Sequence, residues 1–362
     1  MNLLRLLLFP VALLYGVLIF FRNLLFDLGI LPVKEFETGV IVIGNLSVGG
    51  TGKSPMTEYL IRLLKDKFLI ATLSRGYRRH TTGFLLADKN STSHMIGDEP
   101  LQFKKKFPEL IVAVDENRKD GIKKLLSQFP ELKIILLDDA FQHRSVKPGL
   151  SILLTDYTKM FYDDFLLPVG SLREWPTGKK RADIIIATKC PANLSPVEKR
   201  IVQKKVAPDP HQQVLFSHIQ YGTPVPVFTS VLSSPLSGER GTWGEVVLLT
   251  GISNPKPLED YLKDKAEKII PMHYPDHHEY TIVEANKVIE TFNSIASPNK
   301  IIITTEKDAM RLDKPGLVEI LHTLPIYYIP IEVTFDEKEK TDFDKLINDY
   351  VYRTNHKHRG VH

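Results

Sequence analysis

A glycine-rich turn near the N-terminus has residue types that bind phosphate. It follows an apolar run at 41–44 and contains Ser47, Val48, Gly49, Gly50, Thr51, Gly52, Lys53 and Ser54. Glycines let backbone N–H groups curl around an anion, and the helical pattern that follows would add its positive N-terminal end. Lys53 can reach outer phosphates, and the Ser54 hydroxyl can bind Mg²⁺. Ser47 stands where the usual motif has glycine, but the strand, turn and helix pattern still predicts a phosphate-binding loop.

Two adjacent carboxylates, Asp138 and Asp139, end a second apolar run at 133–137. In P-loop enzymes a carboxylate at such a strand end holds Mg²⁺, directly or through water. A single aspartate there is often only a turn residue. The pair, followed by Ala140-Phe141-Gln142-His143-Arg144, is more specific and predicts a metal site near the phosphate loop.

Several cationic residues also follow strand-like runs. Arg75 follows 68–73 and Arg118 follows 110–114, while Arg173 and Glu174 lie in an aperiodic segment that reads as a loop. Arginine at such places can bind phosphate, and the Arg-Glu loop could serve nucleotide and metal. The alternatives are a solvated Arg75, an ordinary surface charge at Arg118, and a surface ion pair in the loop.

Asp98 follows Gly97 at the start of a helical pattern. An aspartate there is commonly an N-cap. The functional interpretation is a general base that takes a proton from a substrate hydroxyl beside a γ-phosphate.

Three histidines lie close together later in the chain, at 273, 277 and 278, with a spacing that fits no standard zinc pattern. A histidine positioned by a carboxylate can instead tune a catalytic aspartate.

Composition limits the class of protein. The 362 residues are 43% hydrophobic and 25% charged, which is typical of a globular chain long enough for two domains. The net charge of +4 gives no support to nucleic-acid binding. The single cysteine, Cys190, excludes an internal disulfide framework, suits a reducing cytosol and reads as a core residue.

The first residues form an uncharged, overwhelmingly apolar run at 6–21, flanked by Arg5 and Arg22. A full membrane span needs about 20 apolar residues, so the length is marginal. No small-residue cleavage site follows, which argues against a secretory signal. We therefore predict a retained helix that inserts into, or lies along, the cytoplasmic face of a membrane, with a plain buried helix as the alternative.

Strand and helix patterns alternate from Glu37 onward, with strand-like runs at 39–44, 68–73, 110–114, 133–138, 151–155 and 183–188. This alternation predicts an α/β fold, a P-loop domain with a mostly parallel sheet, whose ligands bind at the carboxyl ends of the strands. We expect an N-terminal membrane-associated helix at 1–31, a P-loop kinase core at 32–207, a β-type connection at 208–243 and a second, smaller α/β domain at 244–362. Further strands are expected at 245–251, 300–305 and 326–333, and helices at 256–266, 282–295 and 339–351.

Taken together, these motifs resemble the tetraacyldisaccharide 4′-kinase family, the lipid A 4′-kinases of Gram-negative bacteria. The matching segments run in family order from residue 44 to 308: Gly44-Asn45, Gly49-Gly50-Thr51-Gly52-Lys53-Ser54-Pro55, Ser74-Arg75-Gly76-Tyr77, Gly97-Asp98-Glu99-Pro100, Asp138-Asp139-Ala140-Phe141-Gln142-His143-Arg144, Leu172-Arg173-Glu174, Asp276-His277-His278 and Thr305-Glu306-Lys307-Asp308. The departures are small, with Ala140 where the family usually has Gly and Ser54 where it often has Thr.

The resemblance implies transfer of the γ-phosphate of ATP to the 4′-hydroxyl of a tetraacylated glucosamine disaccharide 1-phosphate, at the cytoplasmic face of the bacterial inner membrane. It implies Asp98 as the base with His277 as its partner from the second domain, and Lys53 and Arg75 as stabilisers of the phosphoryl group in transfer. Arg118 and Arg173 would help bind ATP. The residues implied to serve Mg²⁺ are Ser54, Asp138, Asp139 and Glu174.

The main rival from another class is a P-loop GTPase or a metallochaperone-like switch protein. Guanine recognition would need Asn/Thr-Lys-x-Asp after a late strand, and Thr188-Lys189-Cys190-Pro191 has proline where aspartate is required. The partners we expect are the membrane-embedded lipid acceptor and the lipid surface, with no nucleic acid and no obligate protein partner evident.

Overall fold

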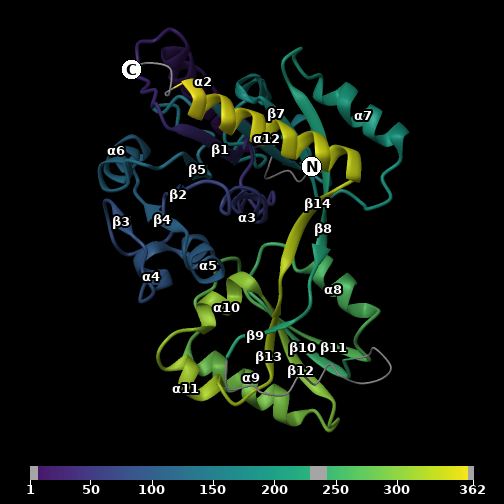
Figure 1. Cartoon of the computed structure of the whole chain (residues 1–362). Coiled ribbons are helices and arrows are strands. Elements are labelled where there is room, and N and C mark those ends of the chain that lie inside the picture. The colour runs from purple at the N-terminus through teal and green to yellow at the C-terminus, as the bar shows by residue number, and fades with distance from the viewer. Residues whose placement is uncertain (1–6, 229–242, 358–362) are drawn as a thin grey trace. The chain divides into compact units, whose positions relative to one another are not determined.

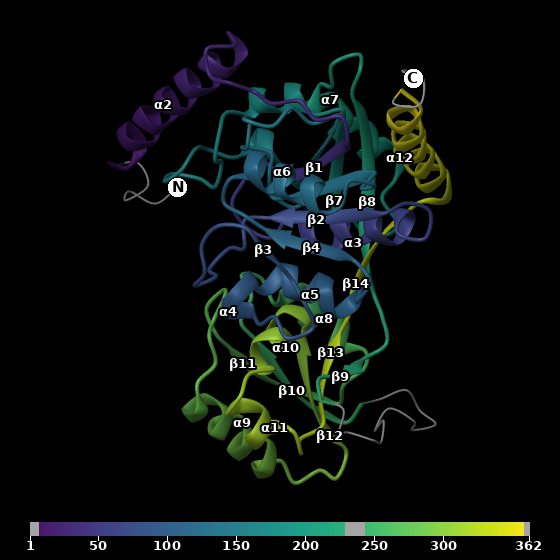
Figure 2. The ribbon, with the colours of Figure 1, turned by 60° about the vertical axis from the view of Figure 1, so that its left-hand side comes forward.

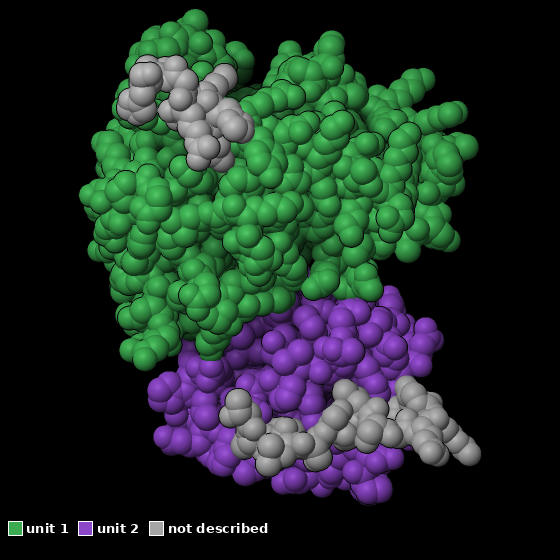
Figure 3. Space-filling view, in the orientation of Figure 1, with its two compact units in different colours: residues 1–220, 332–362 green, residues 221–331 purple. Residues whose placement is uncertain are grey.

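The computed structural model of the chain describes residues 7–228 and 243–357. The chain forms two compact units, one comprising Met1–Gln220 and Glu332–His362 and the other Tyr221–Ile331 (Figure 3). These boundaries differ from the expected ones at 207, 208–243 and 244–362. The first unit takes in part of the expected connection and the whole C-terminal end of the chain.

Long-range pairing explains the difference. Strand β8 (Gln213–Tyr221) pairs in parallel with β7 (Ile184–Thr188), so the expected connection begins inside the first sheet. Helix α12 (Glu337–Lys357) buries Phe343, Ile347 and Val351, which recur every four residues, within the first unit. The backbone N–H of Val40 donates to the hydroxyl of Tyr350, a further residue of α12, at 3.1 Å.

The first unit contains a nine-stranded sheet. Its order is β14 (Ile331–Phe335), β8, β7, β6 (Leu150–Asp156), β1 (Gly39–Asn45), β5 (Ile134–Asp138), β2 (Ile70–Ser74), β4 (Ile111–Val114) and β3 (Leu85–Leu86). The strands from β8 to β4 pair in parallel, and β3 is antiparallel to β4. Every residue of β1, β2 and β5 is buried, as in a sheet covered on both faces.

This order makes β1, β5, β2 and β4 successive neighbours. The ends of these strands and the segments that follow carry the phosphate loop, the two aspartates, Arg75 and Arg118. The helices between these strands are α3 (Lys53–Leu64), α4 (Ser93–Ile96), α5 (Asp98–Lys106) and α6 (Arg118–Gln128), and α7 (Pro196–Val206) follows β7. The carboxyl ends of adjacent parallel strands meet at one edge, where ligands bind in such folds, so the predicted α/β class and P-loop arrangement are confirmed.

The second unit has a five-stranded sheet of its own. Its order is β11 (Lys268–His273), β10 (Glu245–Thr250), β12 (Lys300–Thr305), β13 (Ile326–Ile329) and an antiparallel β9 (Val225–Pro226). The helices are α8 (Lys256–Lys263), α9 (Ile282–Ser294), α10 (Glu306–Leu312) and α11 (Leu317–Leu321). Apolar clusters pack against both faces of the sheet, so this unit has its own core.

Helix α2 (Phe9–Asp27) lies at the periphery of the first unit, away from α12 (Figures 1 and 2). Only Ala12 and Gly16 are buried, and most of its apolar side chains are exposed. The helix is long and apolar enough to cross a membrane, with 11% of its apolar window buried. The residues that face the unit recur every three or four positions, so α2 docks along one narrow stripe.

Candidate active site

Side-chain hydrogen bonds, two glycines and the helix that follows define the conformation of the phosphate loop. The buried amide of Asn45 donates to the Thr51 hydroxyl at 2.7 Å, and the Thr188 hydroxyl donates to the Thr51 carbonyl at 2.9 Å. Gly49 and Gly52 have φ angles of 108° and 85°, which only glycine adopts without strain. Helix α3 begins at Lys53, directly after Gly52, so its N-terminus faces the loop as the sequence predicts.

The loop that carries Arg173 runs beside the phosphate loop. The Val48 N–H donates to the Ser171 carbonyl, and the Arg173 N–H donates to the Leu46 carbonyl, both at 2.7 Å. Two segments more than 120 residues apart in sequence are thus joined by backbone hydrogen bonds. This pairing places Arg173 beside Asp139.

The two aspartates at the end of β5 have different partners. Asp138 pairs with Ile43 of β1 in the sheet and accepts a hydrogen bond from the Thr57 hydroxyl at 3.1 Å. Asp139 takes a left-handed φ of 47° and accepts two hydrogen bonds from Arg173, at 2.9 and 3.3 Å. Lys53 Nζ lies 3.7 Å from Asp139 Oδ1. Asp139 therefore pairs with both Lys53 and Arg173.

The pKa values of the two aspartates also shift in opposite directions. Burial, and then the charge of Asp139, raises the pKa of Asp138 to about 6. Burial also acts to raise the pKa of Asp139, but Lys53 and Arg173 outweigh it and the pKa falls below its usual value. Ser54 is buried in the first turn of α3. Hydroxyl and carboxylate oxygens are the ligands that Mg²⁺ prefers, and another cation would favour ionised Asp138, so this donor set fits Mg²⁺.

Buried cationic groups flank the carboxylates. Arg118 is only 1% exposed, and its Nε has no hydrogen-bond partner among residues 7–228 and 243–357. Burial lowers the pKa of Arg118 to about 10 despite the nearby aspartates. Burial, together with Arg118 and Arg75, lowers the pKa of His143 to about 4. A site with this much positive charge and a buried orphan donor is suited to an anion such as a polyphosphate.

Asp98 is the first residue of α5, and the N-cap is Gly97, so the N-cap alternative for Asp98 does not hold. Gly97 has a φ of 93°, and a Cβ there would lie 3.0 Å from the Tyr77 carbonyl. A Cβ on Gly76 would lie 2.9 Å from the Ile96 carbonyl. The two glycines thus allow close backbone contact between the segment after β2, which carries Arg75, and the turn that presents Asp98.

Glu174 is 2% exposed and is surrounded by donors. It accepts hydrogen bonds from Asn23 at 3.1 Å, Gln142 at 3.0 Å and Arg181 at 2.7 Å. The Gln142 amide also donates to the Asn45 carbonyl at 2.8 Å, which ties the segment after β5 to the phosphate loop. The sequence singled out the run containing Gln142 but assigned it no role. The Mg²⁺ role of Glu174 stays a prediction.

In the second unit, His277 is held by a buried ion pair. Arg311 donates to the His277 Nδ1 at 3.2 Å and to Asp308 at 2.8 Å, and both Arg311 and Asp308 are almost fully buried. A guanidinium can only donate, so Nδ1 of His277 accepts and the neutral ring carries its proton on Nε2. Asp308 belongs to α10, which begins after the N-cap Thr305.

The other two histidines of this segment have separate partners. His273 lies 2.8 Å from Glu259, and His278 lies 2.8 Å from Glu284. Sequence reasoning did not find Arg311. Its only signal is the spacing of one helical turn from Asp308, a pattern that surface ion pairs also show.

Comparison with protein families matches residues 4–351 to the family described as tetraacyldisaccharide-1-P 4′-kinase (LpxK). The chain is 47% identical over 354 residues to a tetraacyldisaccharide 4′-kinase of Bacteroides thetaiotaomicron, covering 95% of this chain and 92% of the relative. It is 46% identical to the enzyme of the same description from Flavobacterium johnsoniae, covering 97% and 98%. The match is therefore nearly complete on both sides.

A solved structure is also similar over nearly the whole chain. It is that of LpxK from Aquifex aeolicus in complex with ATP, with a TM-score of 0.73 and 27% sequence identity. The similarity covers 97% of this chain and 100% of that one. The similar fold and the family match both indicate the tetraacyldisaccharide 4′-kinase family, and the GTPase or metallochaperone-like alternative is not favoured.

Proposed function

This chain belongs to the tetraacyldisaccharide-1-phosphate 4′-kinase family, and from that premise we propose how its residues perform the reaction. The chain transfers the γ-phosphate of ATP to the 4′-hydroxyl of a tetraacyldisaccharide 1-phosphate, which is a step of lipid A biosynthesis. The observation that carries the site assignment is the order β1, β5, β2, β4, which makes the segments bearing Lys53, Asp138, Arg75 and Arg118 neighbours.

The cations of the first unit bind and stabilise the phosphates. The backbone of residues 47–52 surrounds them, Lys53 and Arg75 face the phosphoryl group in transfer, and Arg118 and Arg173 help bind ATP. Lys53 and Arg173 both pair with Asp139 in this structure, which supports a shared phosphate site. Fixed cations of this kind stabilise the charge that spreads over the equatorial oxygens during transfer.

Asp98 is the proposed general base. It accepts the proton of the 4′-hydroxyl while the hydroxyl oxygen bonds to the γ-phosphorus and the bond to the bridging oxygen breaks, leaving ADP. His277 is its proposed partner, and its Nε2 proton suits a hydrogen bond to a carboxylate. Asp98 and His277 lie in different compact units, so the proposed pairing takes one residue from each unit.

Ser54, Asp138 and Asp139 would hold Mg²⁺, with Glu174 serving it through water. When bound, the ion neutralises charge on the phosphate oxygens. The raised pKa of Asp138 and the hard oxygen donors support this assignment. Helix α2 would hold the enzyme at the cytoplasmic face of the inner membrane, where ATP and the acylated acceptor meet; its exposed apolar side chains support this location.

The test measures γ-phosphate transfer from ATP to tetraacyldisaccharide 1-phosphate in detergent for the native chain, Asp98→Asn and Asp66→Asn. Asp66 is an exposed carboxylate paired with Lys65 at the end of α3 and serves as the matched control. We expect Asp98→Asn to lower kcat by roughly 10²–10⁴-fold, the usual range for a general base, and Asp66→Asn to leave it unchanged.

Three results would count against the proposal in different ways. Native-like transfer by Asp98→Asn would remove Asp98 as the base and keep the kinase. Transfer by neither the native chain nor the control would reject this acceptor. Steady ATP or GTP hydrolysis that needs no lipid acceptor would favour the switch-protein alternative.

A further inference from the structure

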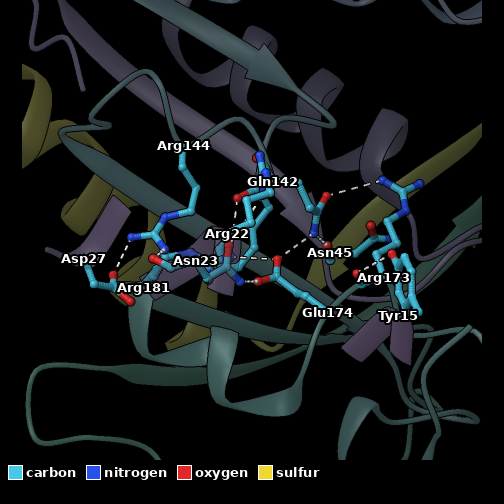
Figure 4. A network of polar contacts seen from close by, with 11 residues as sticks. Tyr15, Arg22, Asn23, Asp27, Asn45, Gln142, Arg144, Arg173, Glu174 and Arg181 are labelled. Atoms are coloured by element: carbon cyan, nitrogen blue, oxygen red, sulfur yellow. Dashed lines mark hydrogen bonds and ion pairs between the residues drawn. The ribbon is translucent and has the colours of Figure 1, made fainter. Parts of the chain in front are cut away.

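Three consecutive residues of the loop beside the phosphate site contact helix α2. The Tyr15 hydroxyl donates to the Arg173 carbonyl at 2.7 Å, and the Asn23 amide donates to the Glu174 carboxylate at 3.1 Å (Figure 4). The Trp175 indole donates to the carbonyl of Gly16 at 2.9 Å. These contacts run from Tyr15 to Asn23, so α2 holds the loop at three points and not at one.

Close packing at Gly16 allows this docking. A Cβ at Gly16 would lie 2.6 Å from the side chains of both Leu166 and Trp175, so any other residue would force these side chains or the helix to shift. A membrane anchor joined to the enzyme only through its chain connection would need none of these contacts. Tyr15 and Asn23 of α2 instead donate to the segment that carries Arg173 and Glu174.

The same loop continues directly into the phosphate site. The Arg173 guanidinium donates twice to Asp139, and its backbone N–H donates to the Leu46 carbonyl at the start of the phosphate loop. Glu174 accepts from Gln142, which also bonds the Asn45 carbonyl. One hydrogen-bonded path therefore runs from α2 through residues 173–174 to the phosphate loop and to Asp139.

We infer that Tyr15 and Asn23 are positioning residues, through which the membrane helix holds Arg173 and Glu174 in the geometry that binds ATP. Membrane attachment and nucleotide binding then share one element. This inference rests on the proposed role of Arg173 in binding ATP. Groups that orient a binding residue from behind commonly change affinity or activity by about 10–100-fold when they are lost.

The experiment compares Tyr15→Phe and Asn23→Leu with the native chain in detergent, without lipid acceptor. Titration calorimetry with ATP and magnesium chloride gives the dissociation constant and the fraction of sites that bind. We expect weaker ATP binding, by about fivefold for Tyr15→Phe, which loses one neutral hydrogen bond, and by at least tenfold for Asn23→Leu, which leaves a buried carboxylate short of a donor. A merely destabilised protein would lose binding sites and keep the dissociation constant.

The two substitutions preserve or increase the apolarity of α2. If α2 served only as a membrane anchor, both variants would bind vesicles at least as well as the native chain and would keep its ATP affinity. Asp27→Asn is the matched control, because Asp27 lies on the same helix and pairs with Arg144 instead of the loop. Native ATP affinity in both variants would overturn the inference.

Arg173→Ala separates this failure from failure of the proposed function. If Arg173→Ala weakens ATP binding while Tyr15→Phe and Asn23→Leu do not, only the inference falls. If Arg173→Ala itself binds ATP like the native chain, the loop has no nucleotide role and the inference falls together with that assignment.

Discussion

At the residue scale, the central residue of the site is Asp139, which pairs with two cations. Its left-handed φ of 47° is unusual for a residue with a Cβ, and the ion pairs with Lys53 and Arg173 hold it there. The same two cations are the proposed phosphate contacts. Phosphate oxygens of ATP would compete with Asp139 for them, so nucleotide binding would exchange one anionic partner for another without leaving buried cations unpaired.

His143 reports on this cluster through its protonation. Burial, with Arg118 and Arg75, lowers the pKa of His143 to about 4, against about 6.5 in an unfolded chain. Because ATP would neutralise part of the nearby positive charge, we expect the pKa of His143 to rise when ATP binds. The measurement is a proton NMR titration of the histidine Cε1–H signals with and without ATP, assigned by comparison with His143→Gln.

The lowered pKa of His143 also sets how the stability of the protein changes with pH. As the pH falls from 6.5 towards 4, the unfolded chain takes up a proton at His143 that the folded chain refuses. The free energy of unfolding of the native chain should therefore fall more steeply over this range than that of His143→Gln. Equal slopes, or a pKa near 6.5 in the absence of ATP, would show that the cluster does not act on His143.

At the scale of elements, α3 and α5 are joined by a buried carboxylate. Glu58 of α3 is 1% exposed and accepts from Gln102 of α5 at 2.7 Å, and Lys106 of α5 lies 2.7 Å from its other oxygen. Helix α3 begins at Lys53 and α5 begins at Asp98. Glu58 thus links the helix of the phosphate loop to the helix of the proposed base.

We expect Glu58→Ala to lower the free energy of unfolding by about 2–3 kcal/mol, because it leaves several donors without their buried partner. Chemical denaturation gives this value. Asp66→Ala, which removes an exposed ion pair just after the end of α3, should cost no more than about 0.5 kcal/mol. Equal losses in the two variants would mean that Glu58 is not a structural link, and an unchanged kcat in Glu58→Ala would mean that it does not position Asp98.

The elements that the sequence predicted well are those with local signals. Strands such as β1 and β5 are continuous apolar runs between polar turns, and the phosphate loop is specified by its glycines and by the helix that follows. The order of these strands in the sheet then brings Asp138, Arg75 and Arg118 to one edge. The burial of Cys190 was also predictable from the strand before it.

What the sequence did not predict depends on tertiary packing. Strand β11 contains Pro271 and reads poorly as a strand; it is tolerated because β11 is at the edge of its sheet. The assignment of β8 and α12 to the first unit rests on pairing and packing across the chain. Arg311, Tyr15 and Asn23 act through long-range contacts, which leave no periodic pattern in the sequence.

At the scale of the whole molecule, α2 has two faces with different tasks. One stripe contacts the first unit, and the other exposes apolar side chains that include Leu14 and Leu18, each 62% exposed. Burial of one such leucine is worth about 1.5–3 kcal/mol. The double variant Leu14→Glu/Leu18→Glu should therefore bind phospholipid vesicles at least 100-fold more weakly in a sedimentation assay.

The same variant should keep native ATP affinity in detergent, since both leucines lie on the exposed face of α2. That result is the reverse of the one expected for Tyr15→Phe, and the pair of results separates attachment from positioning. Vesicle binding at the native level would show that the exposed face of α2 does not enter the membrane.

Catalysis, as proposed, also couples the two units, because Asp98 lies in the first and His277 in the second. If His277 acts only by orienting the Asp98 carboxylate, its removal has no further effect once Asp98 is gone. The double variant Asp98→Asn/His277→Gln should then lose about as much kcat as Asp98→Asn alone, whereas independent roles would make the two losses multiply.

The control cycle pairs Asp98→Asn with Glu284→Gln, which removes the partner of the neighbouring His278. The losses of kcat in this control cycle should multiply. Multiplying losses in the Asp98–His277 cycle would mean that His277 contributes to transfer by a route other than the base.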